Sequence, residues 1–198
     1  IGRVSVVSED FQSLISRMGF EGVSPERNRV IEIGDMIFVK SEYPGGSVLD
    51  ILLPRKQIGD LISKLEDLEY SKMSDDRWNF VRLSMCVPTL VDIEGNLPNE
   101  CGMNNRISNE KGCYPGQEVH ARLESRGRTV KRLCHLTGDS SITLGKHRLS
   151  NGSPANITSC ETANSISYGL AKLRIDDIQS GSVNIEGGNW KVEALTYL

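Results

Sequence analysis

Residues 30–39 decide the fold class: Val30-Ile31-Glu32-Ile33-Gly34-Asp35-Met36-Ile37-Phe38-Val39. Two apolar runs flank Gly34 and Asp35, and glycine followed by a polar residue suits a tight II′ hairpin turn. Apolar runs at residues 4–7 and 48–53 predict two more strands, and the second run ends at Pro54. The hairpin is therefore expected to belong to a larger sheet.

Three helices are expected around these strands. Ser8 is expected to cap the first helix, and Gly19 is expected to end it. The second helix is predicted from the apolar spacing Ile58, Leu61, Ile62, Leu65 and Leu68. The third begins at Ser74-Asp75-Asp76. The order strand, helix, three strands, two helices predicts an α+β fold with a mostly antiparallel sheet.

The second half of the chain has a different pattern. Residues 91–117 are rich in Asn, Gly and Pro and predict a long irregular segment. Beyond it, helical periodicity is absent and short strands are expected at 118–123, 129–136, 146–149, 166–173, 183–185 and 190–198. These strands predict a small β-barrel. The expected domains are an α+β region at 1–133 and a C-terminal β-barrel at 134–198.

Composition excludes several classes of protein. The net charge of −3 argues against a generic nucleic-acid binder, which would usually be basic. The sequence contains no run of about 18 apolar residues, so no membrane span is predicted. Its first residues form a stretch too short and too polar for a secretion signal. The five cysteines include no Cys-x-x-Cys pair, which favours reduced thiols and argues against a zinc site. A cytoplasmic location is predicted, or an organelle matrix in a eukaryotic cell.

One segment carries candidate chemistry: Lys111-Gly112-Cys113-Tyr114-Pro115-Gly116-Gln117-Glu118. The two glycines and the proline predict a tight backbone path that could hold one side chain at a defined angle. Cys113 is the strong nucleophile on this path, and Lys111 would favour its thiolate. Taken alone, these residue types favour a simpler interpretation, in which Cys113 is a small buried apolar residue.

The same eight residues resemble the signature of the YgfZ family, Lys-Gly-Cys-aromatic-x-Gly-Gln-Glu. The continuation Val119-His120-Ala121-Arg122, followed by Gly127 and Arg132-Leu133, also follows that pattern. Upstream, the segment from Arg82 to Pro88 is similar to the family's Arg-Ile-x-x-Gly-x-Pro, with Cys86 where glycine is usual.

A second similarity is to the glycine-cleavage T-protein, a relative of that family. The segment from Phe38 to Pro54 resembles a folate-contacting segment of T-proteins, and Tyr43 and Asp50 agree in type. The glutamate that holds the folate pterin in T-proteins falls on Gly46 here, so a charge-assisted pair of hydrogen bonds is lost.

The resemblance implies a fold of three lobes around a central hole that admits folate, the last lobe being a β-barrel. The family's N-terminal portion is expected to be absent from this sequence. The implied function is tetrahydrofolate binding in support of iron–sulfur cluster assembly or repair, with iron–sulfur proteins or their assembly machinery as partners. Cys113 and Lys111 would be the catalytic residues. The implied folate contacts are Tyr43, Asp50, Tyr114, Gln117, Glu118 and Arg122, and no metal site is expected.

Two alternatives remain open from the sequence. The first is a T-protein-like aminomethyltransferase, which Gly46 and the cysteine motif count against; whether the protein is an enzyme is therefore undecided. The second is a scaffold that keeps the fold and binds no folate. The basic cluster that begins at Arg122 would hold an anion such as the folate tail, or would be a solvated strand face.

Overall fold

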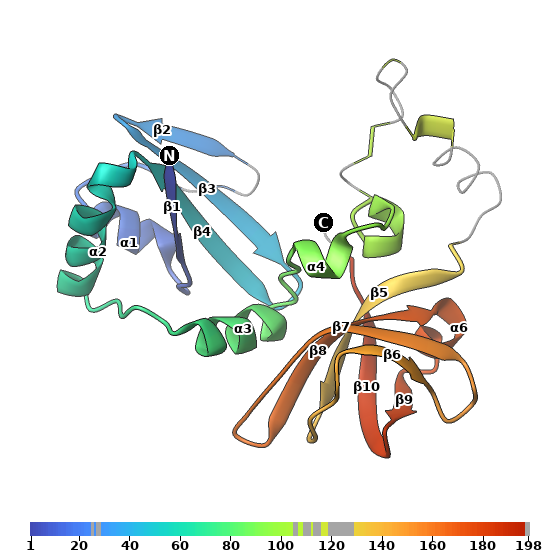
Figure 1. Cartoon of the computed structure of the whole chain (residues 1–198). Helices are drawn as coiled ribbons and strands as arrows, with labels where there is room; N and C mark the ends of the chain where they lie inside the picture. The colour runs from blue at the N-terminus through green and yellow to red at the C-terminus, as the bar shows by residue number, and fades with distance from the viewer. Residues whose placement is uncertain are drawn as a thin grey trace. The chain divides into compact units, whose positions relative to one another are not determined.

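The computed structural model describes residues 1–24, 26, 29–104, 107, 108, 112, 116–118 and 129–196 (Figure 1). The chain divides into two compact units, Ile1–Ser74 and Asp75–Leu198. Each unit combines helices with an antiparallel sheet, so the predicted α+β class is confirmed. The division falls between Ser74 and Asp75, whereas the sequence suggests a boundary at 133/134. A folate-binding region that extends over 1–133 stays a prediction.

The first unit is built on a four-stranded sheet in the order β1-β4-β3-β2. Its elements follow the predicted order: β1 (Gly2–Val6), α1 (Phe11–Arg17), β2 (Val30–Ile33), β3 (Met36–Tyr43), β4 (Gly46–Leu53), the 3₁₀ turn η1 (Arg55–Gln57) and α2 (Ile58–Asp67). Gly34 has φ +58°, the conformation that a II′ turn requires at its first central position. The predicted hairpin is therefore confirmed.

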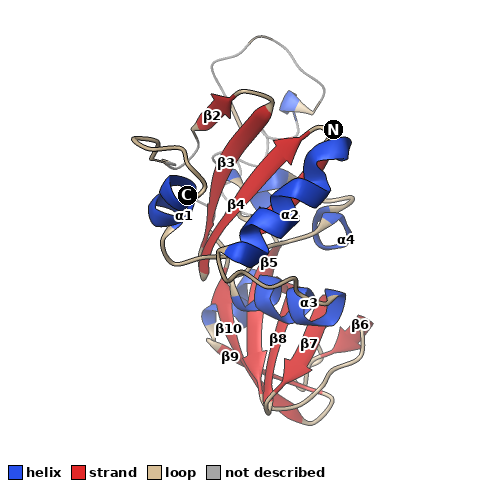
Figure 2. Cartoon of the chain, turned by 90° about the vertical axis from the view of Figure 1, so that its left-hand side faces the viewer, coloured by secondary structure: helices blue, strands red, loops and turns tan. Residues whose placement is uncertain are grey.

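Helices α1 and α2 cover one face of this sheet, and their apolar stripes meet the strand residues that point toward them (Figure 2). Phe38 and Ile51 are cross-strand partners in this core. The predicted helix cap at Ser8 is wrong. Asp10 caps α1 by accepting a hydrogen bond from the Ser13 amide at 2.9 Å. The Ser8 hydroxyl instead accepts a bond from the Asp10 amide at 3.2 Å.

The second unit places a few short helices beside a six-stranded antiparallel sheet that curls into a half-barrel, with strand order β6-β7-β8-β5-β10-β9. Its helical elements are α3 (Asp75–Ser84), α4 (Leu90–Ile93), the 3₁₀ turn η2 (Pro98–Cys101) and α6 (Ile175–Gln179). Its strands are β5 (Lys131–Gly138), β6 (Gly145–Arg148), β7 (Pro154–Ala163), β8 (Ile166–Arg174), β9 (Ser182–Ile185) and β10 (Gly188–Ala194). The barrel-like C-terminal region is confirmed, with the fully buried Trp190 in its core.

Several elements of the second unit differ from the prediction. Strand β7 was not predicted, because polar residues such as Asn156, Thr158 and Ser159 interrupt its apolar pattern. Helix α6 is too short to show a period. Helix α4, which begins at Leu90, overlaps the stretch 91–117 that is expected to be irregular, and turn η2 lies inside it. Of the strand predicted at 118–123, Glu118 is helical and 119–123 lie outside the described residues.

A side chain bridges the two edge strands of the half-barrel, β6 and β9. Glu186 lies in the turn between β9 and β10, and its Oε1 accepts a hydrogen bond from the Thr143 hydroxyl at 2.7 Å. His147 of β6 places Nδ1 3.3 Å from the same oxygen. One backbone bond adds to this seam, from the Ser150 amide to the Asn184 carbonyl at 3.3 Å. The edges are therefore joined mainly by side chains.

Two glycines with similar backbones make a matched test of packing. Gly95 has φ +69° and open space around the position of a Cβ, whereas at Gly102, with φ +76°, a Cβ would meet the Leu195 carbonyl oxygen. We expect Gly95→Ala to lower the free energy of unfolding by about 1 kcal/mol, from left-handed strain alone. Gly102→Ala should cost about 3 kcal/mol, because overpacking adds to that strain. Urea titrations would measure both, and equal losses would contradict the packing argument.

Candidate functional site

The sequence-predicted catalytic and folate-contacting residues fall into two groups. Cys113, Lys111, Tyr114 and Arg122 lie outside the described residues. Gln117 and Glu118 are described as part of a helical turn, with Gln117 half-buried and Glu118 exposed. The geometry around the motif cysteine therefore stays a prediction.

Tyr43 and Asp50 lie on the sheet of the first unit and share the face that points away from α1 and α2. Asp50 is the cross-strand partner of Val39, and Tyr43 lies four residues further along β3. At about 3.3 Å per residue, the two positions are about 13 Å apart along the strand. The structure thus places them on one surface without bringing them into contact.

Asp50 has polar neighbours on this face. Its Oδ1 accepts a hydrogen bond from the Ser5 hydroxyl at 2.5 Å and lies 3.8 Å from Arg3 Nε. Ser5 is directly opposite Asp50 across the β1–β4 pair. An ionised carboxylate offers about four acceptor positions, so Asp50 keeps the capacity to accept bonds from a ligand.

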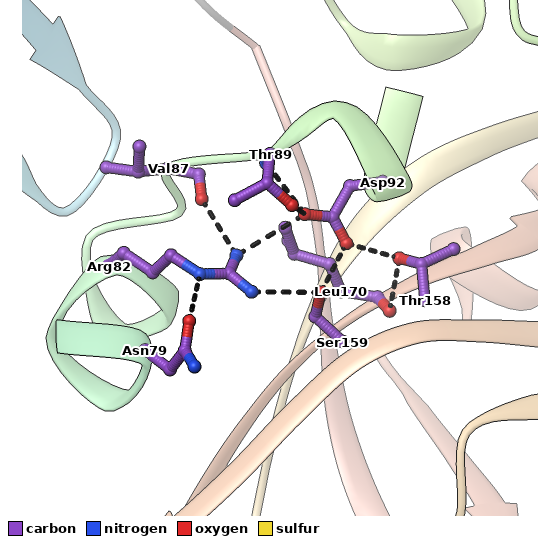
Figure 3. Close-up of polar contacts among 8 residues, drawn as sticks. All are labelled: Asn79, Arg82, Val87, Thr89, Asp92, Thr158, Ser159 and Leu170. Atoms are coloured by element: carbon purple, nitrogen blue, oxygen red, sulfur yellow. Dashed lines mark hydrogen bonds and ion pairs between the residues drawn. The ribbon is translucent and has the colours of Figure 1, made fainter. Parts of the chain in front are cut away.

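A buried ion pair links α3 and α4 of the second unit (Figure 3). The family pattern begins at Arg82, but its partner Asp92 was not predicted as a functional residue. Asp92 of α4 is fully buried, and Arg82 of α3 is nearly so. Arg82 Nη1 lies 3.3 Å from Asp92 Oδ2. Burying two charged groups costs their hydration free energy, which is offset only by their mutual attraction together with further hydrogen bonds.

Asp92 is satisfied first by its own helix. Its Oδ2 accepts bonds from the Thr89 amide at 2.8 Å and the Thr89 hydroxyl at 3.0 Å, which forms the cap of α4. The spacing Thr-x-x-Asp is a capping-box pattern, and it is the signal that could have predicted this helix from sequence.

The other oxygen of Asp92 reaches the sheet. Its Oδ1 lies 2.6 Å from the Ser159 hydroxyl and 2.7 Å from the Thr158 hydroxyl, both on β7. Ser159 also accepts a bond from Arg82 Nη2 at 3.1 Å, so it closes a ring with the ion pair. This network attaches α3 and α4 to the sheet (Figure 3).

Arg82 also holds the chain that follows its own helix. Its Nη1 donates to the Val87 carbonyl at 3.2 Å, and its Nε donates to Asn79 Oδ1 at 2.9 Å. Between them, Cys86 has φ +62°, a backbone conformation that favours glycine. The turn after α3 is therefore held by a side chain that bonds to its backbone.

The described cysteines offer no activated thiol. Burial raises the pKa of Cys86 to about 11 and also raises the pKa of Cys101, Cys134 and Cys160. Thiols of this kind stay protonated near neutral pH and are poor nucleophiles. In the described part of the chain, no group of three or more His, Cys, Asp or Glu side chains is arranged to hold a metal ion. Nor do the described helices include one with the length and apolar character to cross a membrane.

Comparison with known proteins gives one curated relative. The chain is 31% identical over 124 residues to the tRNA-modifying protein YgfZ of Hamiltonella defensa subsp. Acyrthosiphon pisum (strain 5AT). The predicted YgfZ-type resemblance is confirmed. The match covers 60% of this chain and 36% of that protein, so the chain spans about a third of its relative's length. No family model matches the chain.

The YgfZ-type resemblance gives a physical meaning to one departure from the family pattern. Cys86 occupies the position where the predicted Arg-Ile-x-x-Gly-x-Pro pattern has glycine. Its positive φ explains why glycine suits that position, because a residue with a Cβ is strained there. The Arg82 bond to Val87 holds this turn even with cysteine in place.

The buried pair predicts a large loss of stability when one partner is removed. Asp92→Ala should lower the free energy of unfolding by about 3–5 kcal/mol, because it leaves the Arg82 charge buried and unpaired. The double variant Arg82→Met/Asp92→Leu should lose less, since no buried charge remains. Lys191→Ala is the control: it breaks an exposed pair with Glu193 and should cost at most about 1 kcal/mol. Urea titration measures all three; a double variant worse than Asp92→Ala would contradict the argument.

We expect the buried His135 of β5 to make the protein less stable in mild acid. Its ring is buried and stacks on Tyr168 at 5.6 Å. Burial lowers its pKa below the ordinary 6.5, although Glu193 and the Leu83 carbonyl oppose the shift. The unfolded chain therefore binds the proton more readily, so this stability is complete above about pH 6.5 and is lost as the pH falls toward the lower folded pKa.

The measurement is the free energy of unfolding at a series of pH values for the parent protein and for His135→Phe. Phenylalanine keeps an aromatic ring beside Tyr168 and cannot titrate. The variant should show a flatter dependence on pH between about 7 and 5. Parallel curves for the two proteins would rule out His135 as the source.

Proposed function

We propose that this chain belongs to a tetrahydrofolate-binding protein that supports iron–sulfur cluster assembly or repair, with Cys113 as its reactive residue. The observation that carries the proposal is the 31% identity to a YgfZ protein, which agrees with the motif from Lys111 to Glu118. The activity, ligand and partners of the whole protein are all part of the proposal.

The sheet surface that carries Tyr43 and Asp50 supports the folate part. Asp50 has acceptor capacity left beside its bond from Ser5, and a carboxylate suits the neighbouring N–H donors of a pterin ring. Tyr43 offers an aromatic ring for stacking. Folate is an elongated molecule with two ring systems, so contacts about 13 Å apart on one face are compatible with a single ligand.

The motif supplies the proposed reactive group. Lys111 would stabilise the Cys113 thiolate, and Tyr114, Gln117, Glu118 and Arg122 would contact the ligand. The other four cysteines, all described, have raised thiol pKa values, which leaves Cys113 as the candidate thiolate. This contrast supports a special role for the motif cysteine.

A second candidate function is a part in tRNA modification. The printed name of the relative, a tRNA-modifying protein, favours it. The net charge of −3 favours an indirect part over tight binding of tRNA by this chain. Mass spectrometry of tRNA nucleosides from cells with and without the gene would test it; unchanged nucleosides would exclude it.

Calorimetry of the full-length protein with 5-formyltetrahydrofolate tests the folate proposal. Asp50→Asn and Tyr43→Ala should each weaken binding about tenfold or more, because each removes one contact of the order of 1.4 kcal/mol. Asp35→Asn, which removes the same charge from the β2–β3 turn, is the control and should bind normally. Absence of binding at millimolar folate would exclude folate and favour the scaffold alternative.

The cysteine has a separate test. Cys113→Ala should bind folate as the parent protein does, because the thiol is proposed to act after binding. In cells, the same variant should fail to support iron–sulfur enzymes, measured as the activity of such enzymes in extracts. Full support by Cys113→Ala would show that the reactive thiol is not required.

A further inference from the structure

The loop between β6 and β7, residues 149–153, contains the one Asn-Gly pair of the sequence, Asn151-Gly152. Both residues are exposed. In such a pair the backbone nitrogen of the glycine can attack the side-chain amide of the asparagine. The attack is easier than at other asparagines, because glycine has no side chain to hinder the approach and has a freer backbone. The loop therefore carries a group that can react with its own chain.

The reaction, deamidation, needs only the chain and water. A bond forms between the Gly152 nitrogen and Asn151 Cγ, and the bond from Cγ to Nδ2 breaks. Nδ2 leaves as ammonia, which takes the proton that the Gly152 amide gives up. Water then opens the cyclic succinimide at either carbonyl and leaves aspartate or isoaspartate. The attack thus requires a Gly152 amide free of other bonds and an Asn151 side chain that is able to turn toward it.

The folded loop meets neither requirement. The Gly152 amide donates to the Leu149 carbonyl at 2.8 Å. The Asn151 side chain is held at both of its polar atoms. Its Oδ1 accepts a bond from the Ser153 amide at 2.9 Å, and its Nδ2 donates to Asp177 Oδ1 at 2.7 Å. Asp177 lies on α6 and is buried, so this bond joins the loop to a fixed acceptor. Bonds to a carboxylate are stronger than bonds between neutral groups.

A second exposed turn of the same unit lacks these restraints. Asn164 and Ser165 connect β7 to β8 and have φ +51° and +60°. Within the described part of the chain, the Asn164 side chain makes no hydrogen bond. The more reactive sequence, Asn151-Gly152, therefore lies in the turn that is better restrained.

We propose that Asn151 is a deamidation site that the bond to Asp177 blocks in the folded protein and that opening of residues 149–153 makes reactive. The product also keeps the loop open. Aspartate or isoaspartate at position 151 lacks the Nδ2 donor, so Asp177 Oδ1 loses its bond and meets a second carboxylate. A loop that has opened and reacted no longer binds α6 as before. The site goes beyond the proposed function and does not depend on it.

Peptide mass spectrometry of the full chain, incubated at mildly alkaline pH, measures the rate of deamidation at Asn151 and at Asn164. Asp177→Ala removes the acceptor and should accelerate the reaction at Asn151 about tenfold. Asp176→Ala, which removes the exposed neighbouring carboxylate, should react as the parent protein does. Asn164 is the internal reference, and its rate should be equal in all three proteins. Equal rates at Asn151 in Asp177→Ala and in the parent would overturn the proposal.

Two further measurements do not depend on how Asp177→Ala folds. Unfolding the parent protein in urea should accelerate deamidation more at Asn151 than at Asn164, because the native restraints hold Asn151 alone of the two; an equal or smaller acceleration would overturn the proposal. Asn151→Asp reproduces the aspartate product, and hydrogen exchange at the Gly152 amide should become about tenfold faster in it. Asn164→Asp, the same chemical change in the other turn, should leave that exchange unchanged. Unchanged exchange in Asn151→Asp would show that the product does not keep the loop open.

Discussion

The buried carboxylate of Asp92 is the constraint on which the second unit depends. It has no exposed surface, so each of its oxygens needs donors from the protein itself. One oxygen is bound by Thr89 and Arg82, and the other by the hydroxyls of β7. Because these donors come from two helices and a strand, satisfying one charge requires the helices to sit in one place on the sheet.

This constraint explains which parts of the fold could be predicted. Elements whose stability comes from an apolar face, such as α2 and the hairpin around Gly34, have a period that is visible in the sequence. Strand β7 has no such visible period, because Thr158 and Ser159 use their hydroxyls to bond to Asp92 instead of packing an apolar side chain. A strand chosen for hydrogen bonds to a distant carboxylate lacks the alternation from which strands are predicted.

The candidate site divides in the same way. Tyr43 and Asp50 were predicted from a resemblance, and their placement on one sheet face follows from the period of a strand. The pairing of Asp92 with Ser159, 67 residues away, has no local signal. The bond from Asn151 to Asp177 is equally hidden, since it needs the loop after β6 to meet α6. Local patterns predicted surfaces and cores, but they could not predict polar contacts between distant segments.

The seam at Glu186 has a consequence for association between molecules. The open edges of a sheet present unpaired N–H and C=O groups that can recruit a strand from another chain. In this half-barrel the two edge strands, β6 and β9, shield each other, because Glu186 in the turn after β9 bonds to Thr143 and lies beside His147 of β6. Bonds from Thr143, and more weakly the charge of His147, lower the pKa of Glu186, so the anchor stays ionised in mild acid. Stronger acid removes that charge and weakens the side-chain anchor, so the protection of both edges depends in part on the protonation of one surface carboxyl.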